Sequence, residues 1–379
     1  MHRHHRTFIV SIMLAVLGTT LLSGCDFSGI RDTGNDKSDH ASAEQVASTE
    51  QTPESFDPGV LVPVKHPWHK GDFQNGIQIL WNTQDKYVEY DADRILDYVV
   101  DLGANSLGLS FPIYVDGATP TMTRAGSDTP SVQALRYVVE QAKVRKLRVS
   151  LRPLIFTTKN GSGPWRGSID PIPGWFMSYR NFLAPYLDLA TASGVDEFVL
   201  GTELTSQQKS REWPETIKFA RQIYPGKLSY TLNTFLGKKP PFPDLGINMY
   251  PKVMESDNAS INTLTKKLTK WLNRQQAILK TDLTIQEVAI AGRSNSYLDP
   301  NNWADTTADK QFRAIPAMQS KWFAAAYVAA KNVGANGIYF WGLNSAQQFG
   351  EDLDRNEQPL GNFVGRPGER AIKALFTQR

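Results

Sequence analysis

The sequence predicts an α/β protein with one (β/α)8 barrel, the TIM-barrel architecture, behind an export signal and a disordered linker. The prediction depends on three observations. All nine tryptophans and all thirteen tyrosines lie after residue 64. Beyond that point, short apolar runs alternate with amphipathic stretches, which is typical of parallel strands joined by helical crossovers. There are eight such runs, and no glycine-rich phosphate loop follows the first, so a closed barrel is favoured over an open doubly wound sheet.

The first 24 residues are typical of an export signal. A basic start, MHRHHR, precedes an apolar segment from Thr7 to Leu22 that is too short for a secure permanent membrane span. The following Leu22-Ser23-Gly24-Cys25 resembles the bacterial lipobox, which implies cleavage before Cys25 and attachment of lipid, including palmitate, to its sulfur. A plain signal anchor with an incidental cysteine is the alternative. Asp26 resembles the signal that retains lipoproteins in the inner membrane, and this predicts a membrane-anchored domain that faces the periplasm.

Residues 25–64 are expected to form a disordered acidic linker. Between positions 26 and 58 there are two basic and eight acidic residues and very few aromatic ones, so the segment cannot bury enough apolar surface to fold. The predicted domains are therefore the signal peptide 1–24, the lipidated cysteine and linker 25–64, and the barrel 65–379. Basic residues of the barrel are dispersed rather than grouped in runs, so we expect no nucleic-acid partner, and we expect a monomer.

Eight strands and seven helices account for most of the predicted barrel. Several strands are near-continuous apolar runs, such as IQIL, FVLG and GIYFW, which suits strands buried on both faces. The crossover 234–244 carries three prolines and is too short for a convincing helix. The expected strands are 76–81, 106–111, 147–154, 197–203, 227–233, 245–250, 283–288 and 337–341. The expected helices are 91–102, 131–146, 175–193, 213–224, 261–280, 315–333 and 367–376.

The composition excludes several kinds of catalytic site. Cys25 is the only cysteine, so the chain can hold no disulfide framework. No histidine follows position 69, so from residue 70 onward there is no Ser-His-Asp triad and no HExxH zinc site. Hydrolytic chemistry would have to come from carboxylates, lysines or tyrosines. The acidic segment Glu351–Glu357 suggests calcium, but it lacks the glycine and the final bidentate glutamate of an EF-hand loop. A solvated acidic loop is the simpler interpretation, and no metal or cofactor is expected.

Two predicted strands end in a glutamate. Glu203 ends the fourth strand and Glu287 lies near the end of the seventh, and the carboxyl ends of barrel strands form the face that carries the chemistry. Cleavage of a glycosidic bond needs one carboxylic acid to protonate the leaving oxygen and a second carboxylate at the anomeric centre. A structural role, as a helix cap or as a partner for an arginine, is the alternative for each glutamate alone.

Several segments of the sequence resemble those of glycoside hydrolase family 113. This is a family of retaining (β/α)8 glycosidases that includes endo-β-1,4-mannanases. The similar segments, spread over residues 75–376, are Ser150–Leu154, Trp165–Pro171, Trp175–Tyr179, Gly201–Leu204, Ile247–Tyr250, Gln286–Ser294, Phe340–Trp341 and Gly365–Glu369. The resemblance implies that Glu203 is the acid/base and Glu287 the nucleophile. Thr202 stands where many members of the wider clan have asparagine, and Ala289 where they have glycine. These departures affect substrate detail more than mechanism.

Seven further residues are candidates for substrate binding. Arg152, at the end of the third strand, could stabilise a carboxylate or pair with a structural acid. Tyr250 could donate to Glu287 or to the ring oxygen of a sugar, or could be a core aromatic; Asn248 lies on the same face. Tryptophans at strand ends can stack on sugars, and the candidates are Trp81, Trp165, Trp303 and Trp341, with Trp341 favoured beneath the cleavage point.

We therefore expect a retaining glycoside hydrolase that cleaves a β-linked polysaccharide or oligosaccharide by double displacement. A non-catalytic carbohydrate-binding lipoprotein on the same barrel, acting in polysaccharide export or assembly, is the alternative from a different class.

Overall fold

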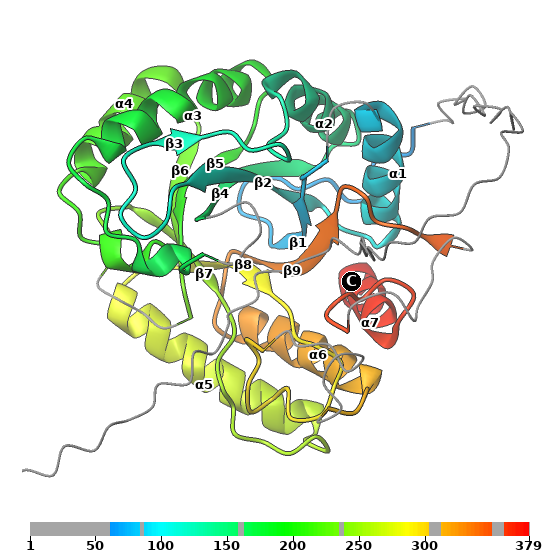
Figure 1. Cartoon of the computed structure of the whole chain (residues 1–379). Coiled ribbons are helices and arrows are strands. Elements are labelled where there is room, and N and C mark those ends of the chain that lie inside the picture. The colour runs from blue at the N-terminus through cyan, green and yellow to red at the C-terminus, as the bar shows by residue number, and fades with distance from the viewer. Residues whose placement is uncertain are drawn as a thin grey trace, which may run out of the picture.

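The computed structural model describes residues 61–83, 87–157, 163–234, 239–302, 312–350 and 360–378. Within them, eight parallel strands close into a barrel, because β1 pairs with both β2 and β9, and helices surround it (Figure 1). The predicted (β/α)8 fold is thus confirmed. The barrel strands are β1 (Gln74–Leu80), β2 (Ser106–Val115), β4 (Arg148–Phe156), β5 (Glu197–Thr202), β6 (Lys227–Leu232), β7 (Asp244–Asn248), β8 (Leu283–Val288) and β9 (Gly337–Asn344).

The helices cover the outside of the barrel with their apolar faces. α2 and α5 each begin after a serine, Ser131 and Ser260, whose hydroxyl accepts a hydrogen bond from a backbone N–H of the first turn. Neighbouring helices pack in pairs, α1 on α2, α3 on α4, and α6 on both α5 and α7. The helices are α1 (Val88–Asp101), α2 (Val132–Val144), α3 (Trp175–Ala192), α4 (Trp213–Ile223), α5 (Ile261–Leu279), α6 (Pro316–Asn332) and α7 (Pro367–Thr377).

The predicted elements agree with the observed ones to within a few residues at most ends. No helix is found between β6 and β7 in the described part of that crossover, as its prolines predict. Three strands continue farther than expected, β2 to Val115, β4 to Phe156 and β9 to Asn344. The short strand β3 (Thr123–Arg124), antiparallel to the end of β2, was not predicted because two residues carry no periodic signal.

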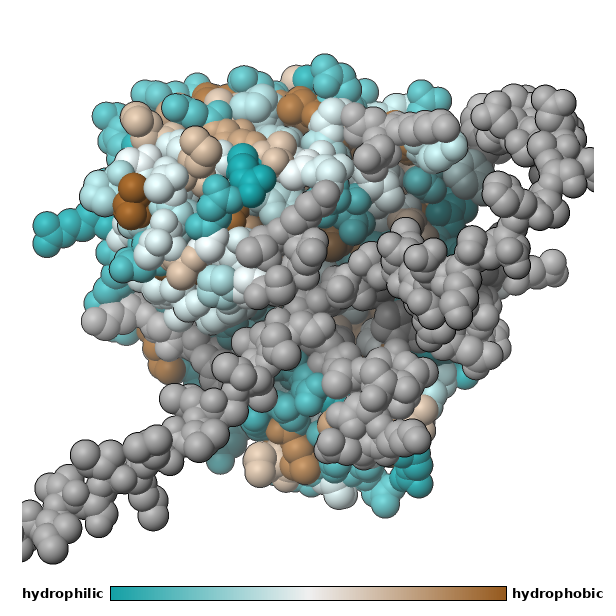
Figure 2. Space-filling model, viewed as in Figure 1, coloured by the Kyte–Doolittle hydropathy of each residue, from teal (hydrophilic) through white to brown (hydrophobic). Residues whose placement is uncertain are grey.

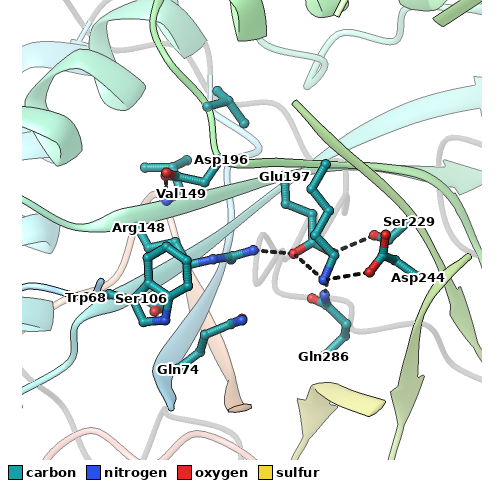
Figure 3. A network of polar contacts seen from close by, with 12 residues as sticks. Trp68, Gln74, Ser106, Arg148, Val149, Asp196, Glu197, Ser229, Asp244 and Gln286 are labelled. Carbon is teal, nitrogen blue, oxygen red and sulfur yellow. Dashed lines mark hydrogen bonds and ion pairs between the residues drawn. The ribbon is translucent and has the colours of Figure 1, made fainter. Parts of the chain in front are cut away.

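The end of the barrel where the strands begin is filled by a polar network (Figure 3). We call it the basal cluster, and its central ion pair joins Arg148 of β4 to Glu197 of β5. Ser229 and Gln286 donate to the same oxygen of Glu197, at 2.5 and 3.2 Å, and the Trp68 ring lies 5.3 Å from the Arg148 guanidinium. Packed side chains therefore close this end of the barrel. They are held in place by an ion pair and hydrogen bonds as well as by contact with an aromatic ring.

Most large apolar side chains of the described residues are buried inside the barrel or beneath its helices. On the face seen in Figure 2, hydrophobic residues at the surface are scattered among hydrophilic ones. In the part of the chain that the structure describes, no helix is long and apolar enough to cross a membrane.

Candidate active site

The structure brings Glu203 and Glu287 together at the opposite, carboxyl end of the strands. One amide joins them: Asn248 Nδ2 lies 2.9 Å from Glu203 Oε1 and 3.3 Å from Glu287 Oε2. Those two oxygens therefore cannot be farther apart than the sum of these distances. Their side chains are 11% and 15% exposed, so both carboxylates reach the solvent at the barrel mouth rather than the packed interior.

Glu287 receives hydrogen bonds from three side chains, one on β4 and two on or just after β7. Arg152 of β4 donates from Nη2 to Glu287 Oε2 at 2.8 Å, and the Tyr250 hydroxyl donates to Oε1 at 2.6 Å. The Arg152 side chain is fully buried, and its Nε is held by the Ser110 hydroxyl at 2.9 Å. A carboxylate with a fixed guanidinium and a phenol beside it is oriented and electrostatically stabilised, as a nucleophile requires.

Glu203 has a different environment. Arg166 Nη1 donates to Glu203 Oε2 at 2.8 Å, while the amides of Asn233 and Asn248 donate to Oε1 at 3.2 and 2.9 Å. Burial raises the pKa of Glu203, and the nearby charge of Glu287 raises it further, against the opposing effects of Arg166, Asn248 and Arg152. A carboxyl group with a raised pKa beside a second carboxylate can hold a proton and donate it, as a general acid does.

Local backbone irregularities position both glutamates. Glu203 itself has a φ of 57°, in the left-handed region that non-glycine residues adopt rarely. In β8 the pairing register shifts between Ile285 and Val288, so that Gln286 is directed to the basal cluster and its neighbour Glu287 to the mouth. Shifts of this kind recur beside active sites because they redirect a side chain that regular alternation would place elsewhere. These departures from regular geometry support a functional interpretation of the mouth.

The aromatic candidates behave differently from one another. Trp341 is half-buried in β9, and its ring lies 5.6 Å from the Arg152 guanidinium, which places it beside the two glutamates. Trp165 is also half-buried, but its ring packs over Gly167, where an added Cβ would clash with it. Trp81 is only 1% exposed and belongs to the hydrophobic core, so its ring has no free face for a sugar. The structure therefore does not support Trp81 as a substrate-binding residue, because its side chain is turned into the core although it lies at a strand end.

Several sequence expectations lie outside the described residues. They are the export signal 1–24, the lipidation site Cys25 with Asp26, the linker up to residue 60, the loop tryptophan Trp303, and the acidic segment Glu351–Glu357. Among the described residues, no group of three or more His, Cys, Asp or Glu side chains is arranged to hold a metal ion.

Two side chains on Glu203 were not predicted as members of its environment. Asn233 follows β6 directly, so the rule that strand ends carry the chemistry could have identified it. Arg166 lies in the loop after β4, ten residues beyond the end of that strand. No local signal predicts that a loop arginine turns back over a neighbouring strand.

A closed (β/α)8 barrel with two adjacent carboxylates at its mouth is the arrangement that glycoside hydrolases use. Residues 79–358 match Glycoside Hydrolase Family 113, and the chain belongs to this family. A solved GH113 β-1,4-mannanase, described in a complex, is 22% identical with a TM-score of 0.68, and the match covers 81% of this chain and 100% of that one. A GH113 β-mannanase from Alicyclobacillus acidocaldarius is 18% identical with a TM-score of 0.65, with 81% and 97% covered. At these identities the structural matches show the fold, and no curated protein matches the chain.

Proposed function

We propose that this glycoside hydrolase cleaves a β-linked, mannan-like polysaccharide or oligosaccharide with retention of anomeric configuration. The observation that carries the proposal is the single amide of Asn248 within hydrogen-bond distance of both glutamates. The upper bound that it sets on the separation of two carboxylate oxygens is below the ~6.5–9.5 Å typical of inverting enzymes and compatible with the ~5–5.5 Å of retaining ones. The β-mannanases of the same family support mannan as the substrate class.

The reaction then proceeds in two displacements. Glu287 attacks the anomeric carbon, the glycosidic C–O bond breaks, and Glu203 gives its proton to the departing oxygen. In the second step Glu203, now a carboxylate, takes a proton from water, whose oxygen attacks the anomeric carbon and releases Glu287. Arg152 and Tyr250 orient Glu287 throughout, and Trp341 provides an apolar face for the sugar ring beside it.

The proposal is tested by trapping the intermediate. A 2-fluoro-mannoside with a good leaving group should inactivate the enzyme and label Glu287, as peptide mass spectrometry would show. Glu287→Ala should be inactive and unlabelled. Glu203→Ala should retain cleavage only of substrates whose leaving group needs no proton, such as dinitrophenyl glycosides. Hydrolysis by both variants at the parent's rate would contradict the assignment, and sugar binding without any turnover by the parent would instead support a non-catalytic carbohydrate-binding protein.

We further propose that Cys25 is lipidated, that the acidic linker connects it to the barrel, and that the barrel faces the periplasm as a monomer anchored to the inner membrane. The lipobox-like Leu22–Cys25 and the following Asp26 support this placement. Cys25→Ser should prevent processing and lipid attachment. An unchanged mature size and unchanged membrane fractionation would contradict it.

A further inference from the structure

The hydrogen bonds on Glu203 leave one position for a proton. An ionised carboxylate has about four lone-pair sites, two on each oxygen. Oε1 accepts from two amides, Asn233 and Asn248, which fill both of its sites. Among the described residues, Oε2 accepts only from Arg166, so one site remains on this oxygen. A proton on Glu203 therefore belongs on Oε2, beside the guanidinium.

Arg166 is held in place by contacts other than Glu203. Its Nε donates to the backbone carbonyl of Ile155 at 2.8 Å, and its guanidinium lies 5.4 Å from the centre of the Phe156 ring. Both partners are at the end of β4, so the loop arginine is fixed to the barrel itself. Its side chain is 19% exposed, which leaves it at the edge of the space that a substrate would enter.

We propose that Arg166 is a positioning residue for the acid/base Glu203: it holds Oε2 as the oxygen that gives its proton to the departing sugar, and it stabilises the carboxylate left behind. The inference rests on the proposed function, since it assigns a partner to the same proton transfer. In the first displacement the O–H bond on Oε2 breaks and the proton goes to the glycosidic oxygen. The new negative charge then forms directly beside Arg166.

The proposed role of Arg166 predicts the direction in which the pH dependence of kcat/KM should shift when this arginine is removed. The groups that face Glu203 are two arginines, two amides, a tyrosine and a carboxylate. They are Arg166 from the loop after β4, Arg152 from β4, Tyr230 from β6, Asn233 after β6, Asn248 from β7 and Glu287 from β8. Burial and Glu287 raise the pKa of Glu203, whereas Arg166 lowers it. Without Arg166 the pKa should therefore rise further, and the alkaline limb of kcat/KM, which reports loss of the acid in the free enzyme, should move to higher pH.

The experiment compares Arg166→Gln and Arg166→Lys with the full-length parent. For Arg166→Gln we expect the alkaline limb to rise by about one pH unit or more, as expected when a neighbouring opposite charge is lost. With a manno-oligosaccharide kcat should fall about tenfold, a fraction of the 10²–10⁴ that acid/base catalysis contributes, and less with a dinitrophenyl leaving group. Arg166→Lys keeps the charge and should keep the limb near that of the parent. The matched control is Arg124→Gln, which removes an exposed arginine paired with Asp116. This variant should change neither the alkaline limb of kcat/KM nor kcat.

A uniform loss of rate with an unmoved limb would overturn the proposal, because it would indicate a purely structural role. If Arg166→Gln does not fold, Arg166→Met, which also removes the charge, takes its place with the same two readouts. An unmoved limb with equal losses for both leaving groups would then overturn the proposal. Failure of the proposed function is distinguishable, since Glu203→Gln and Glu287→Gln would then be as active as the parent.

Discussion

The two ends of the barrel carry the same kinds of residue in different surroundings. β4 supplies an arginine to each end, Arg148 near its start and Arg152 four residues later on the same face. Arg148 pairs with Glu197 in the basal cluster, where both side chains are at most 3% exposed. Arg152 pairs with Glu287 at the mouth, where the glutamate is 15% exposed. One end is sealed, and the other is open to solvent on one side.

The two ends of the barrel also differ in the ratio of cationic side chains to carboxylates. In the basal cluster, burial opposes ionisation of Glu197, but Arg148 and Lys227 together lower its pKa. At the mouth, two carboxylates share two arginines, and burial together with Glu287 raises the pKa of Glu203. An excess of cations around one carboxylate fixes it as a charged structural group. A pair of carboxylates in one buried space instead leaves one of them able to exchange a proton, which is what acid/base catalysis uses.

The mouth and the basal cluster should differ most when one carboxylate is neutralised at each end of the barrel: one change should remove activity, and the other should lower stability. Glu287→Gln should reduce glycoside hydrolysis below detection, because an amide cannot serve as the nucleophile, while the domain stays folded. Glu197→Gln should leave kcat unchanged in the folded protein but lower the free energy of unfolding by about 3–5 kcal/mol, because Arg148 becomes a buried charge without a partner. Hydrolysis assays and urea denaturation would measure the two effects.

The control for this contrast is Asp244→Asn. Asp244 belongs to the same basal network through Lys227, but its side chain is 43% exposed, so its loss should cost no more than ~1 kcal/mol. A loss of stability in Glu197→Gln no larger than in this control would show that the basal cluster is not the fixed structural element inferred here. A loss of activity in Glu197→Gln with normal stability would show that the two ends are coupled.

A smaller effect is expected from Tyr250→Phe at the mouth. The change removes only the hydroxyl that donates to Glu287 at 2.6 Å and keeps the ring. A hydrogen bond to a charged group contributes about 1.5–3 kcal/mol, so kcat/KM should fall roughly 10–100-fold. Tyr339→Phe removes a buried hydroxyl of the basal cluster that contacts Arg148 and Gln74, and should alter stability instead of rate. Equal rates for Tyr250→Phe and the parent would remove Tyr250 from the catalytic machinery.

The fold could be predicted because the barrel repeats a simple pattern. Each buried parallel strand is a short apolar run, and the rule that chemistry lies at carboxyl strand ends directed attention to Glu203, Glu287 and Asn248. Arg152 was predicted beside a carboxylate, and the structure shows that this carboxylate is Glu287. Strand-end position is thus a strong local signal for polar residues.

The features that could not be predicted depend on three-dimensional geometry that no local sequence pattern encodes. Trp81 also lies at a strand end, but it is turned into the core, because position alone does not determine which way a side chain points. Arg166 reaches Glu203 from a loop, and Gln286 and Glu287 face opposite ends through a register shift in β8. The basal cluster was not predicted, since its members come from strands far apart in the sequence and meet only when the barrel closes.

The smallest expected effect is the pH dependence of stability, which should have opposite signs at the two ends. Glu197 has a native pKa below its ordinary value near 4.5, so its contribution is present above that pH and is lost as the pH falls. Glu203 has a native pKa above that value, so the native state binds more protons above about pH 4.5 and stability declines as the pH rises through the raised pKa. Glu203→Gln should therefore gain stability relative to the parent between pH 5 and 8, and the deficit of Glu197→Gln should shrink toward pH 3. Urea denaturation across this range measures both differences. Parallel slopes for the two variants would contradict the distinction between a structural and a proton-exchanging carboxylate, since only opposite charge environments produce opposite signs.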